Sequence, residues 1–340
     1  MSDNLFGKTI AELKLISESL DLPDYTSSQI ADWLYKKNIS SVDDMTNLSK
    51  SARQALSDRY YIGTSLPVKE EISKDGTIKY LFSVKDRKYI ETVYIPEQKR
   101  KTLCISTQIG CKMGCIFCIT GKQGFQGNLD TGEILNQIRS QKENESISNI
   151  VYMGMGEPLN NPDAVLKSLE ILTSAYGYSM SPRRITVSTI GIMPALNRFI
   201  EKSECNLAIS LQSPFADERR YLIPLEKKYP IKQIVETLRR YNIKGQRRLS
   251  FEYIMFKRFN DTDAHIKELA GLLNGIKCRI NLIRFHSFKG SVLESSDEQT
   301  IQKFKDKLNR KGLFTTVRVS RGQDISAACG MLSTWALNKS

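Results

Sequence analysis

The sequence lacks several features that would place it in a familiar class of protein. It has no run of 18 or more apolar residues, so we expect no membrane-spanning helix. Its start, MSDNLFGKTIAELKLISESL, lacks the basic segment and apolar core of a secretory signal. The seven cysteines are odd in number and are not spaced as a disulfide framework, which predicts reduced thiols. Together these absences predict a cytoplasmic protein with no membrane partner.

Acidic residues are outnumbered by basic ones in the chain as a whole, but not in residues 1–60. The net charge is +13, whereas residues 1–60 hold 7 Lys and Arg against 9 Asp and Glu. A basic surface of this size favours a polyanion such as nucleic acid, through release of its counterions, and a basic protein without such a partner is the alternative. Aromatic residues lie among the recurring basic pairs, and this combination favours an RNA-binding face. The pairs are Arg219-Arg220, Lys227-Lys228, Arg239-Arg240 and Arg247-Arg248, and the aromatic residues are Tyr221, Tyr229, Tyr241 and Phe251.

The chain divides into three parts by its residue patterns. With 340 residues, of which 40% are hydrophobic, it is long enough for one large domain and an appendage. Residues 1–60 have apolar side chains at helical spacing, as at Ile10, Leu13 and Ile16, and predict a small helical domain. Between 61 and 100, the segments KYLFSV (79–84) and ETVYIP (91–96) predict a short β extension or linker. Residues 101–340 form the third and largest part.

From residue 103 onward, predicted strands and helices alternate. Six or so consecutive βα units indicate a parallel sheet covered by helices, either an open barrel or a doubly wound sheet. In both architectures, functional residues collect at the carboxyl ends of the strands. The predicted strands are 103–106, 147–154, 184–189, 206–211, 249–255, 279–285 and 315–320, and the predicted helices are 131–142, 162–176, 193–201, 231–241, 261–273 and 297–310.

Three cysteines follow the first of these strands, in the segment GCKMGCIFCITGKQGF (110–125). Cys111, Cys115 and Cys118 have C-x3-C-x2-C spacing, whereas a structural zinc site needs four protein ligands. Thiolates also suit iron–sulfur clusters. A [4Fe–4S] cluster held by three cysteines keeps one iron without a protein ligand, and that iron can chelate the amino and carboxylate groups of S-adenosylmethionine. The alternative is a zinc site completed by Cys104 or by a remote residue.

The next three strands each end in a polar or glycine-containing motif: MGMGEP (153–158), TVSTIG (186–191) and SLQSP (210–214). These motifs would lie at the same rim as the cysteines. The cysteine spacing, with Phe117 before the last cysteine, resembles the signature of the radical SAM superfamily, and MGMGEP resembles its glycine-rich motif. The resemblance implies an α/β fold, a radical SAM partial (β/α)6 barrel, with one [4Fe–4S] cluster on Cys111, Cys115 and Cys118.

The resemblance covers about residues 1–335 and narrows to the RlmN/Cfr family of RNA adenosine methyltransferases. Members methylate C2 or C8 of an adenosine in the peptidyl-transferase region of 23S ribosomal RNA, and C2 members also modify the adenosine 3′ to the anticodon in some tRNAs. GEPLNN (156–161) and RGQDISAACG (321–330) look more like the C2 type, so we expect that specificity. The matching stretches are IETVYIP (90–96), TLCISTQIGCKMGCIFC (102–118), QGFQGNL (123–129), MGMGEPL (153–159), RRITVSTIGI (183–192), LAISLQSP (207–214) and DISAACGML (324–332).

The resemblance also implies how C2 of adenine, which is not nucleophilic, can be methylated. Cys329 takes a methyl group from one S-adenosylmethionine, and a second S-adenosylmethionine yields the radical that removes hydrogen from this S-methyl group. The carbon radical then adds to the adenine and makes a covalent protein–RNA adduct. Glu91 is the general base for the ring proton, and Cys104 attacks the sulfur of Cys329 to release the product. Such thiol exchange requires accessible, deprotonated cysteines.

For S-adenosylmethionine binding, the resemblance implies seven positions. Two of them depart from the family, because Gln212 replaces a common histidine and His286 replaces an asparagine. Backbone atoms at 212 can still contribute, and a histidine at 286 can still make a hydrogen bond. The seven positions are Gly156, Glu157, Ser188, Ser210, Leu211, Gln212 and His286.

The remaining expectations concern partners and alternatives. The resemblance implies a flavodoxin or ferredoxin as electron donor, and adenine-C8 methylation is the alternative within the family. A methylthiotransferase would need three further cysteines for a second cluster, and the remaining ones are badly spaced. A non-enzymatic iron–sulfur redox sensor that binds RNA would need neither MGMGEP nor the pair Cys104 and Cys329. We expect Cys205 and Cys278 to be small buried residues, and His265 to be solvated surface.

Overall fold

The computed structural model describes residues 2–241 and 247–334 of the chain. Its main sheet has ten strands in the order β14-β13-β12-β11-β10-β9-β6-β5-β4-β3. The seven strands from β14 to β6 run parallel, and the chain returns from each to the next through helices. These strands are β6 (Arg100–Cys104), β9 (Asn149–Tyr152), β10 (Ile185–Thr189), β11 (Asn206–Ser210), β12 (Leu249–Met255), β13 (Arg279–Arg284) and β14 (Thr315–Val317).

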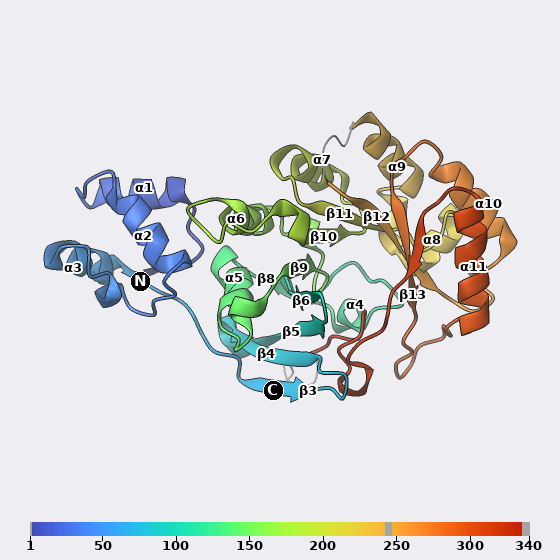
Figure 1. Cartoon of the computed structure of the whole chain (residues 1–340), viewed down its shortest axis with the longest axis horizontal. Helices are drawn as coiled ribbons and strands as arrows, with labels where there is room; N and C mark the ends of the chain where they lie inside the picture. The colour runs from blue at the N-terminus through green and yellow to red at the C-terminus, as the bar shows by residue number, and fades with distance from the viewer. Residues whose placement is uncertain (1, 242–246, 335–340) are drawn as a thin grey trace.

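Helices cover the outside of this curved sheet (Figure 1). They are α5 (Thr131–Arg139), α6 (Pro162–Thr173), α7 (Met193–Lys202), α9 (Ile231–Arg240), α10 (Asp263–Leu272) and α11 (Glu298–Arg310). The predicted radical SAM fold is therefore confirmed, and the predicted elements differ from the observed ones only at their ends. The short helices α4 (Ile119–Gln123) and α8 (Ala216–Leu222) were not predicted, because five and seven residues are too few to show a helical period.

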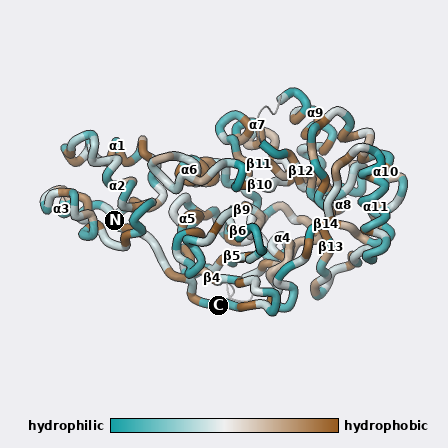
Figure 2. Tube along the Cα trace, in the orientation of Figure 1, coloured by the Kyte–Doolittle hydropathy of each residue, from teal (hydrophilic) through white to brown (hydrophobic). Residues whose placement is uncertain are grey.

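The two faces of the parallel sheet differ in polarity. On β12, Tyr253 points outward and its ring stacks on Phe304 of α11, with ring centroids 5.6 Å apart. Ser250 and Glu252 occupy the alternate positions and are joined by a 2.9 Å hydrogen bond. Figure 2 shows hydrophilic and hydrophobic residues alternating along the strands and the helices. The inner face of the sheet can therefore hold a polar site.

The residues between 61 and 100 extend this sheet. β3 (Lys69–Ile72), β4 (Ile78–Val84) and β5 (Lys88–Glu97) pair antiparallel with one another, and β5 pairs antiparallel with β6. In the range where we expect a β extension or linker, the three strands form one edge of the barrel sheet. This arrangement places Glu91 and Cys104 on neighbouring strands, because Val93 is directly opposite Cys104.

The N-terminal region consists of α1 (Ile10–Ser19), α2 (Thr26–Tyr35) and α3 (Lys50–Arg59), with β1 (Asp3–Asn4) paired to β2 (Tyr60–Tyr61). It packs against α5 so closely that a Cβ atom on Gly7 would lie 2.4 Å from the backbone nitrogen of Gly132. The ring of Tyr35 also lies 6.1 Å from that of Tyr178. The helical region and the barrel therefore share one apolar core (Figure 1). No helix in the described ranges is long and apolar enough to cross a membrane.

Candidate active site

Backbone hydrogen bonds join the carboxyl ends of the first strands. The N–H of Gly154 donates to the carbonyl of Ile105 over 3.0 Å, and the N–H of Thr107 donates to Met155 over 2.8 Å. Beyond β9, the buried carboxylate of Glu157 accepts hydrogen bonds from the Thr189 hydroxyl (2.5 Å) and from the N–H of Ile190 (3.0 Å). The motifs that follow β6, β9 and β10 therefore form one continuous rim, as the sequence predicts.

Arg219 of α8 extends this rim to the next strand. Its guanidinium is fully buried, forms an ion pair with Glu226, and donates to the carbonyls of Ile190 (2.8 Å), Ser210 (3.0 Å) and Leu211 (3.0 Å). It thus fastens the end of β11 to the end of β10. Arg219 cannot belong to an RNA-binding face, because it is fully buried, and no sequence pattern predicts this internal role.

The three cysteines lie on the loop between β7 (Gln108–Gly110) and α4. Cys111 and Cys115 are buried, Cys118 is half-buried, and the N–H of Cys118 donates to the Cys115 carbonyl over 3.2 Å. Burial raises the pKa of Cys111 to about 12, and the charges of Glu157 and Cys118 act in the same direction. Burial also raises the pKa of Cys115 well above its usual value, with Cys118 and Cys111 adding to the effect. The three thiols are therefore close enough to interact electrostatically.

These thiols fit an iron–sulfur cluster in their chemistry. Each would be costly to ionise alone, and a bound cation removes that cost by taking a thiolate directly. Among residues 2–241 and 247–334, no three His, Cys, Asp or Glu side chains converge on a single metal position. A cubane cluster makes a different demand, because each of its three cysteines binds a separate iron atom. Cys111, Cys115 and Cys118 are the residues that would hold it.

The segment after β14 returns across the barrel and brings Cys329 to the cysteine loop. The N–H of Ile119 donates to the carbonyl of Gly330 over 2.9 Å, and Thr120 donates to the carbonyl of Leu332 over 2.7 Å. Gly330 has a φ of +81°, and a Cβ atom there would lie 3.2 Å from the carbonyl oxygen of Phe117. Glycine permits both this backbone conformation and this close approach.

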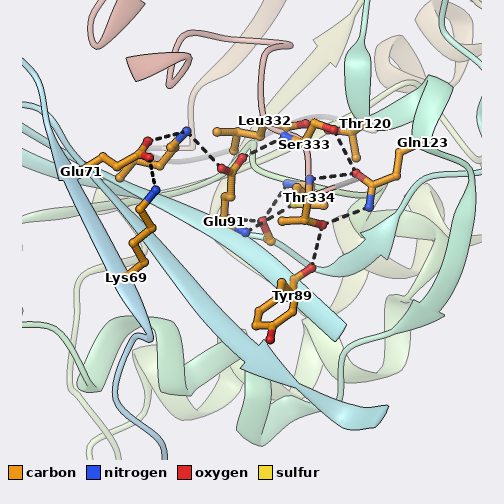
Figure 3. Close-up of polar contacts among 12 residues, drawn as sticks. Lys69, Glu71, Tyr89, Glu91, Thr120, Gln123, Leu332, Ser333 and Thr334 are labelled. Atoms are coloured by element: carbon orange, nitrogen blue, oxygen red, sulfur yellow. Dashed lines mark hydrogen bonds and ion pairs between the residues drawn. The ribbon is translucent and has the colours of Figure 1, made fainter. Parts of the chain in front are cut away.

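Glu91 fixes the end of the same segment, as Figure 3 shows. One carboxylate oxygen accepts from the N–H of Ser333 over 2.8 Å, and the other lies 3.1 Å from the ammonium group of Lys79. Burial raises the pKa of Glu91, although Lys79 opposes this effect. A carboxylate with a raised pKa, bound to the segment that carries Cys329, is suited to accept a proton.

Cys104 and Cys329 are 225 positions apart in sequence, yet their thiols interact. Cys104 is half-buried at the end of β6, whereas the side chain of Cys329 is exposed. Burial raises the pKa of Cys104 to about 12, and a charge on Cys329 would raise it further. Surrounding protein also raises the pKa of Cys329, and the nearby guanidinium of Arg318 partly offsets this. Cys329 is accessible, as such thiol exchange requires. The raised pKa values of Cys104 and Cys329 favour the protonated thiols, which differs from the deprotonated state that the exchange requires.

The expected S-adenosylmethionine positions lie along the same rim, but not all offer a side chain. Gly156 has a φ of +97°, and a Cβ atom there would lie 2.5 Å from the side chain of Gln108. Burial raises the pKa of Glu157 to about 7, and its oxygens are already occupied by the protein. Leu211 is buried. Ser188 and Ser210 are half-buried at the ends of β10 and β11.

The two positions that depart from the family pattern are both held by neighbours. Gln212 has a φ of +62°, and its side chain accepts a hydrogen bond from the N–H of Ile254 over 2.7 Å. Its carbonyl also accepts a hydrogen bond from the Asn260 side chain over 2.7 Å, so the backbone at 212 is engaged as well as the side-chain oxygen. His286 lies 2.8 Å from the Ser320 hydroxyl, and burial, with a smaller effect of Arg284, lowers its pKa. A neutral imidazole at 286 can still donate or accept a hydrogen bond.

Comparison with known proteins bears on what this rim does. A family model described as the radical SAM superfamily matches residues 105–273, and one described as the ribosomal RNA large subunit methyltransferase N-terminal domain matches residues 3–62. A protein of Bacteroides thetaiotaomicron named "Probable dual-specificity RNA methyltransferase RlmN" is 53% identical over 97% of this chain and 96% of its own length. The chain belongs to the RlmN family.

A further relative and a solved structure agree with this assignment. The "Dual-specificity RNA methyltransferase RlmN" of Buchnera aphidicola is 40% identical over 99% of this chain and 95% of its own length. The crystal structure of a radical SAM methyltransferase from Sphaerobacter thermophilus is 38% identical, with a TM-score of 0.89, over 97% of this chain and 99% of that one. Membership of the radical SAM superfamily implies a [4Fe–4S] cluster and S-adenosylmethionine as its partner.

Several residues outside the rim differ from expectation in this member of the RlmN family. His265 is buried and not solvated; it contacts the Thr262 hydroxyl at 2.7 Å and Glu218 at 2.8 Å. Phe251 is in the core and cannot face RNA. Cys205 is buried as predicted, and Cys278 is half-buried. Lys79, Gln123 and Arg318 are candidate site residues that sequence reasoning missed, since isolated polar residues form no motif.

Proposed function

We propose that this chain methylates C2 of an adenosine in 23S ribosomal RNA, and of the adenosine 3′ to the anticodon in some tRNAs, in the cytoplasm. The observation that carries the proposal is the placement of Cys329. Its segment is fastened to the cysteine loop through Gly330 and to Glu91 through Ser333. The segment that carries this exposed thiol thus joins the loop of the candidate cluster ligands to a candidate base, and the thiol is within electrostatic range of Cys104. The two RlmN relatives are named dual-specificity RNA methyltransferases, which supports a proposal with two kinds of RNA substrate.

The cofactor requirement follows from the cysteine loop. We propose one [4Fe–4S] cluster on Cys111, Cys115 and Cys118, two S-adenosylmethionine molecules per turnover, and a flavodoxin or ferredoxin as electron donor. When bound, the cluster supplies the electron that splits S-adenosylmethionine into methionine and a 5′-deoxyadenosyl radical. Gly156, Glu157, Ser188, Ser210, Leu211, Gln212 and His286 remain our proposed S-adenosylmethionine positions.

The chain's own residues then perform three steps. First, the Cys329 thiol loses its proton and its sulfur takes the methyl group of one S-adenosylmethionine. Second, after a hydrogen atom is removed from this methyl group and the carbon bonds to adenine C2, Glu91 takes the ring proton. The electron that leaves the ring would return to the cluster, which gave one electron to S-adenosylmethionine. Third, the sulfur of Cys104 attacks that of Cys329, so the S–C bond breaks, a disulfide forms, and a proton completes the product methyl group.

Two cysteine variants test this sequence of steps. Cys329→Ala should carry no methyl group and give no RNA product. Cys104→Ala should lose only the last step, so it should accumulate RNA covalently bound to Cys329. That species should survive denaturing gels and leave a nucleotide mass on the Cys329 peptide after nuclease digestion. Cys205→Ala, which alters a buried thiol away from the rim, is the control and should form product.

The RNA product itself distinguishes the regiochemistry. Nucleoside mass spectrometry of reacted ribosomal RNA and tRNA, with synthetic 2-methyladenosine and 8-methyladenosine as standards, should show the 2-methyl isomer in both RNAs. The 8-methyl isomer would replace the proposed C2 activity with the alternative one.

In the experiment with the cysteine variants, identical inactivity of both, with no adduct in either, would rule out the two-cysteine mechanism.

A further inference from the structure

The inner face of the barrel holds a buried carboxylate that the proposed reaction does not use. Glu252 of β12 is buried, and its Oε1 accepts hydrogen bonds from Ser250 (2.9 Å) and from Asn281 of β13 (2.7 Å). Thr316 of β14 in turn donates to Asn281 over 2.9 Å. The other oxygen of Glu252 is buried without a hydrogen-bond partner in the described part of the chain. Burying an ionised carboxylate costs free energy unless a cation lies nearby.

Arg318 supplies that cation. Its backbone N–H donates to Leu282 over 2.8 Å, and its carbonyl accepts from Arg284 over 2.8 Å, so the start of its side chain is fixed. Its guanidinium lies 3.6 Å from Oε1 of Glu252, which is an ion pair beyond hydrogen-bond distance. The side chain is 40% exposed and donates no hydrogen bond to any described residue. The guanidinium is paired with Glu252 and keeps its donors, so it is available to a ligand.

The surroundings of Arg318 indicate which ligand. The charge of Glu252, and to a smaller extent the thiols of Cys329 and Cys104, raise the pKa of Arg318. The guanidinium is thus within electrostatic range of both proposed catalytic thiols. In the proposed adduct, adenine C2 is separated from the Cys329 sulfur by a single carbon atom. The ring nitrogens N1 and N3, which flank C2, must then also lie near Cys329.

We propose that Arg318, held in place by Glu252, binds the target adenine by donating a hydrogen bond to a ring nitrogen next to C2. This inference rests on the proposed C2 methylation. Both N1 and N3 of adenine accept hydrogen bonds, whereas N1 of guanine carries a proton and C2 of guanine carries an amino group. Arginine has only donors, so a contact to N1 favours adenine over guanine, whereas at N3, which accepts in both bases, only the bulk of the guanine amino group opposes guanine. The same contact stabilises charge that develops on the ring nitrogens when carbon adds to C2.

The decisive experiment compares base analogues in an RNA hairpin. Hairpins with adenosine, 1-deazaadenosine or 3-deazaadenosine at the target position are titrated against the cluster-loaded chain without S-adenosylmethionine. The unaltered chain should bind adenosine about tenfold more tightly than the analogue that lacks the contacted nitrogen, which is typical of a hydrogen bond to a charged group. Arg318→Gln should bind all three hairpins equally. Arg310→Gln, on the outer helix α11, is the control and should keep the discrimination.

Further measurements separate this inference from its competitors. Cys329 methylation by S-adenosylmethionine, in the absence of RNA, should still reach completion in Arg318→Gln, which also shows that the variant is folded. Arg318→Lys, which keeps the charge but loses the planar donors, should discriminate less than the unaltered chain. Unchanged discrimination in Arg318→Gln, or loss of Cys329 methylation in it, would overturn the inference; the second result would assign Arg318 to S-adenosylmethionine. Product formation by the unaltered chain on the adenosine hairpin reports separately on the proposed function.

Discussion

The two rims of the barrel differ in how their polar residues are used. At the carboxyl rim, charged residues such as Glu157, Arg219 and Glu91 are buried and each has defined partners. At the amino rim, Arg183, Arg184 and Arg248 are exposed residues that precede β10 and β12. The carboxyl rim is therefore built for chemistry at fixed positions, whereas the amino rim contributes mainly to the field of a chain with net charge +13.

This difference corrects the sequence-based interpretation of the basic pairs. Arg239 donates to the carbonyl of Leu272 over 2.6 Å, and Arg247 donates to that of Ile200 over 3.3 Å, so both join elements of the barrel. Arg219 is internal to the carboxyl rim. A count of charge along the sequence cannot separate arginines that face solvent from arginines that satisfy buried carbonyls.

The largest effect is expected from removing one of the three cysteines at the carboxyl rim. Cys115→Ala should abolish the cluster, and with it all cleavage of S-adenosylmethionine, because no other described thiol can replace the buried Cys115. After anaerobic reconstitution, the unaltered chain should bind about four iron atoms. Cys278→Ala, at the start of β13 and away from that rim, should retain the full iron content. Stoichiometric zinc in anaerobically purified protein would contradict the cluster.

The carboxyl rim could be predicted from sequence because its residues follow a rule of position. In a parallel sheet, whatever follows each strand gathers at one edge, so the motifs at 110–118, 153–158 and 186–191 had to meet. The proximity of Cys104 and Cys329 could be expected only from the family resemblance. No periodicity predicts that a segment after the last strand crosses the barrel to the first one. The hydrogen bonds that hold this segment, such as the one from the Ser333 N–H to Glu91, come from the main chain, so the side chains in the sequence do not indicate them.

The next largest effect concerns stability. Arg219→Met would leave Glu226 buried without its cation and the carbonyls of Ser210 and Leu211 without a donor. Breaking a buried pair in this way costs about 3–5 kcal/mol of unfolding free energy. Arg220→Met, one residue away in an exposed pair with Asp217, should change it by no more than about 0.5 kcal/mol. Urea unfolding followed by circular dichroism measures both, and equal stability of the two variants would contradict the internal role.

A smaller effect should appear in the pH dependence of RNA methylation. The proposed base Glu91 acts when ionised, so the rate should fall as the pH drops below its raised pKa. Burial raises this pKa and Lys79 lowers it, so Lys79→Met should raise the pKa further and move the acid limb of the profile to higher pH. At alkaline pH the variant should approach the unaltered rate.

Lys69→Met is the matched control for this shift. Lys69 pairs with Glu71 at 2.7 Å, as Lys79 does at 3.0 Å, but it does not contact Glu91 (Figure 3). It should therefore leave the acid limb in place. A profile of Lys79→Met that moves to lower pH, or does not move, would show that Glu91 is not the titrating base.

The smallest effect is expected in the salt dependence of RNA affinity, measured for one charge-reversal variant at each rim. Lys112 is an exposed residue of the cysteine loop, and its ammonium group lies 5.6 Å from the ring centroid of Phe125, itself 42% exposed. RNA that delivers an adenine to this rim has phosphates within reach of Lys112, so Lys112→Glu should lower the slope of log affinity against log salt by about 1. Arg248→Glu, at the opposite rim, should leave the slope unchanged, because salt at about 0.15 M screens charges beyond about 8 Å. Both variants should keep their iron, which shows that the cysteine loop is intact. Equal changes in slope would mean that RNA contacts both rims, and the exposed arginines before β10 and β12 would then belong to the binding face that the sequence first suggested.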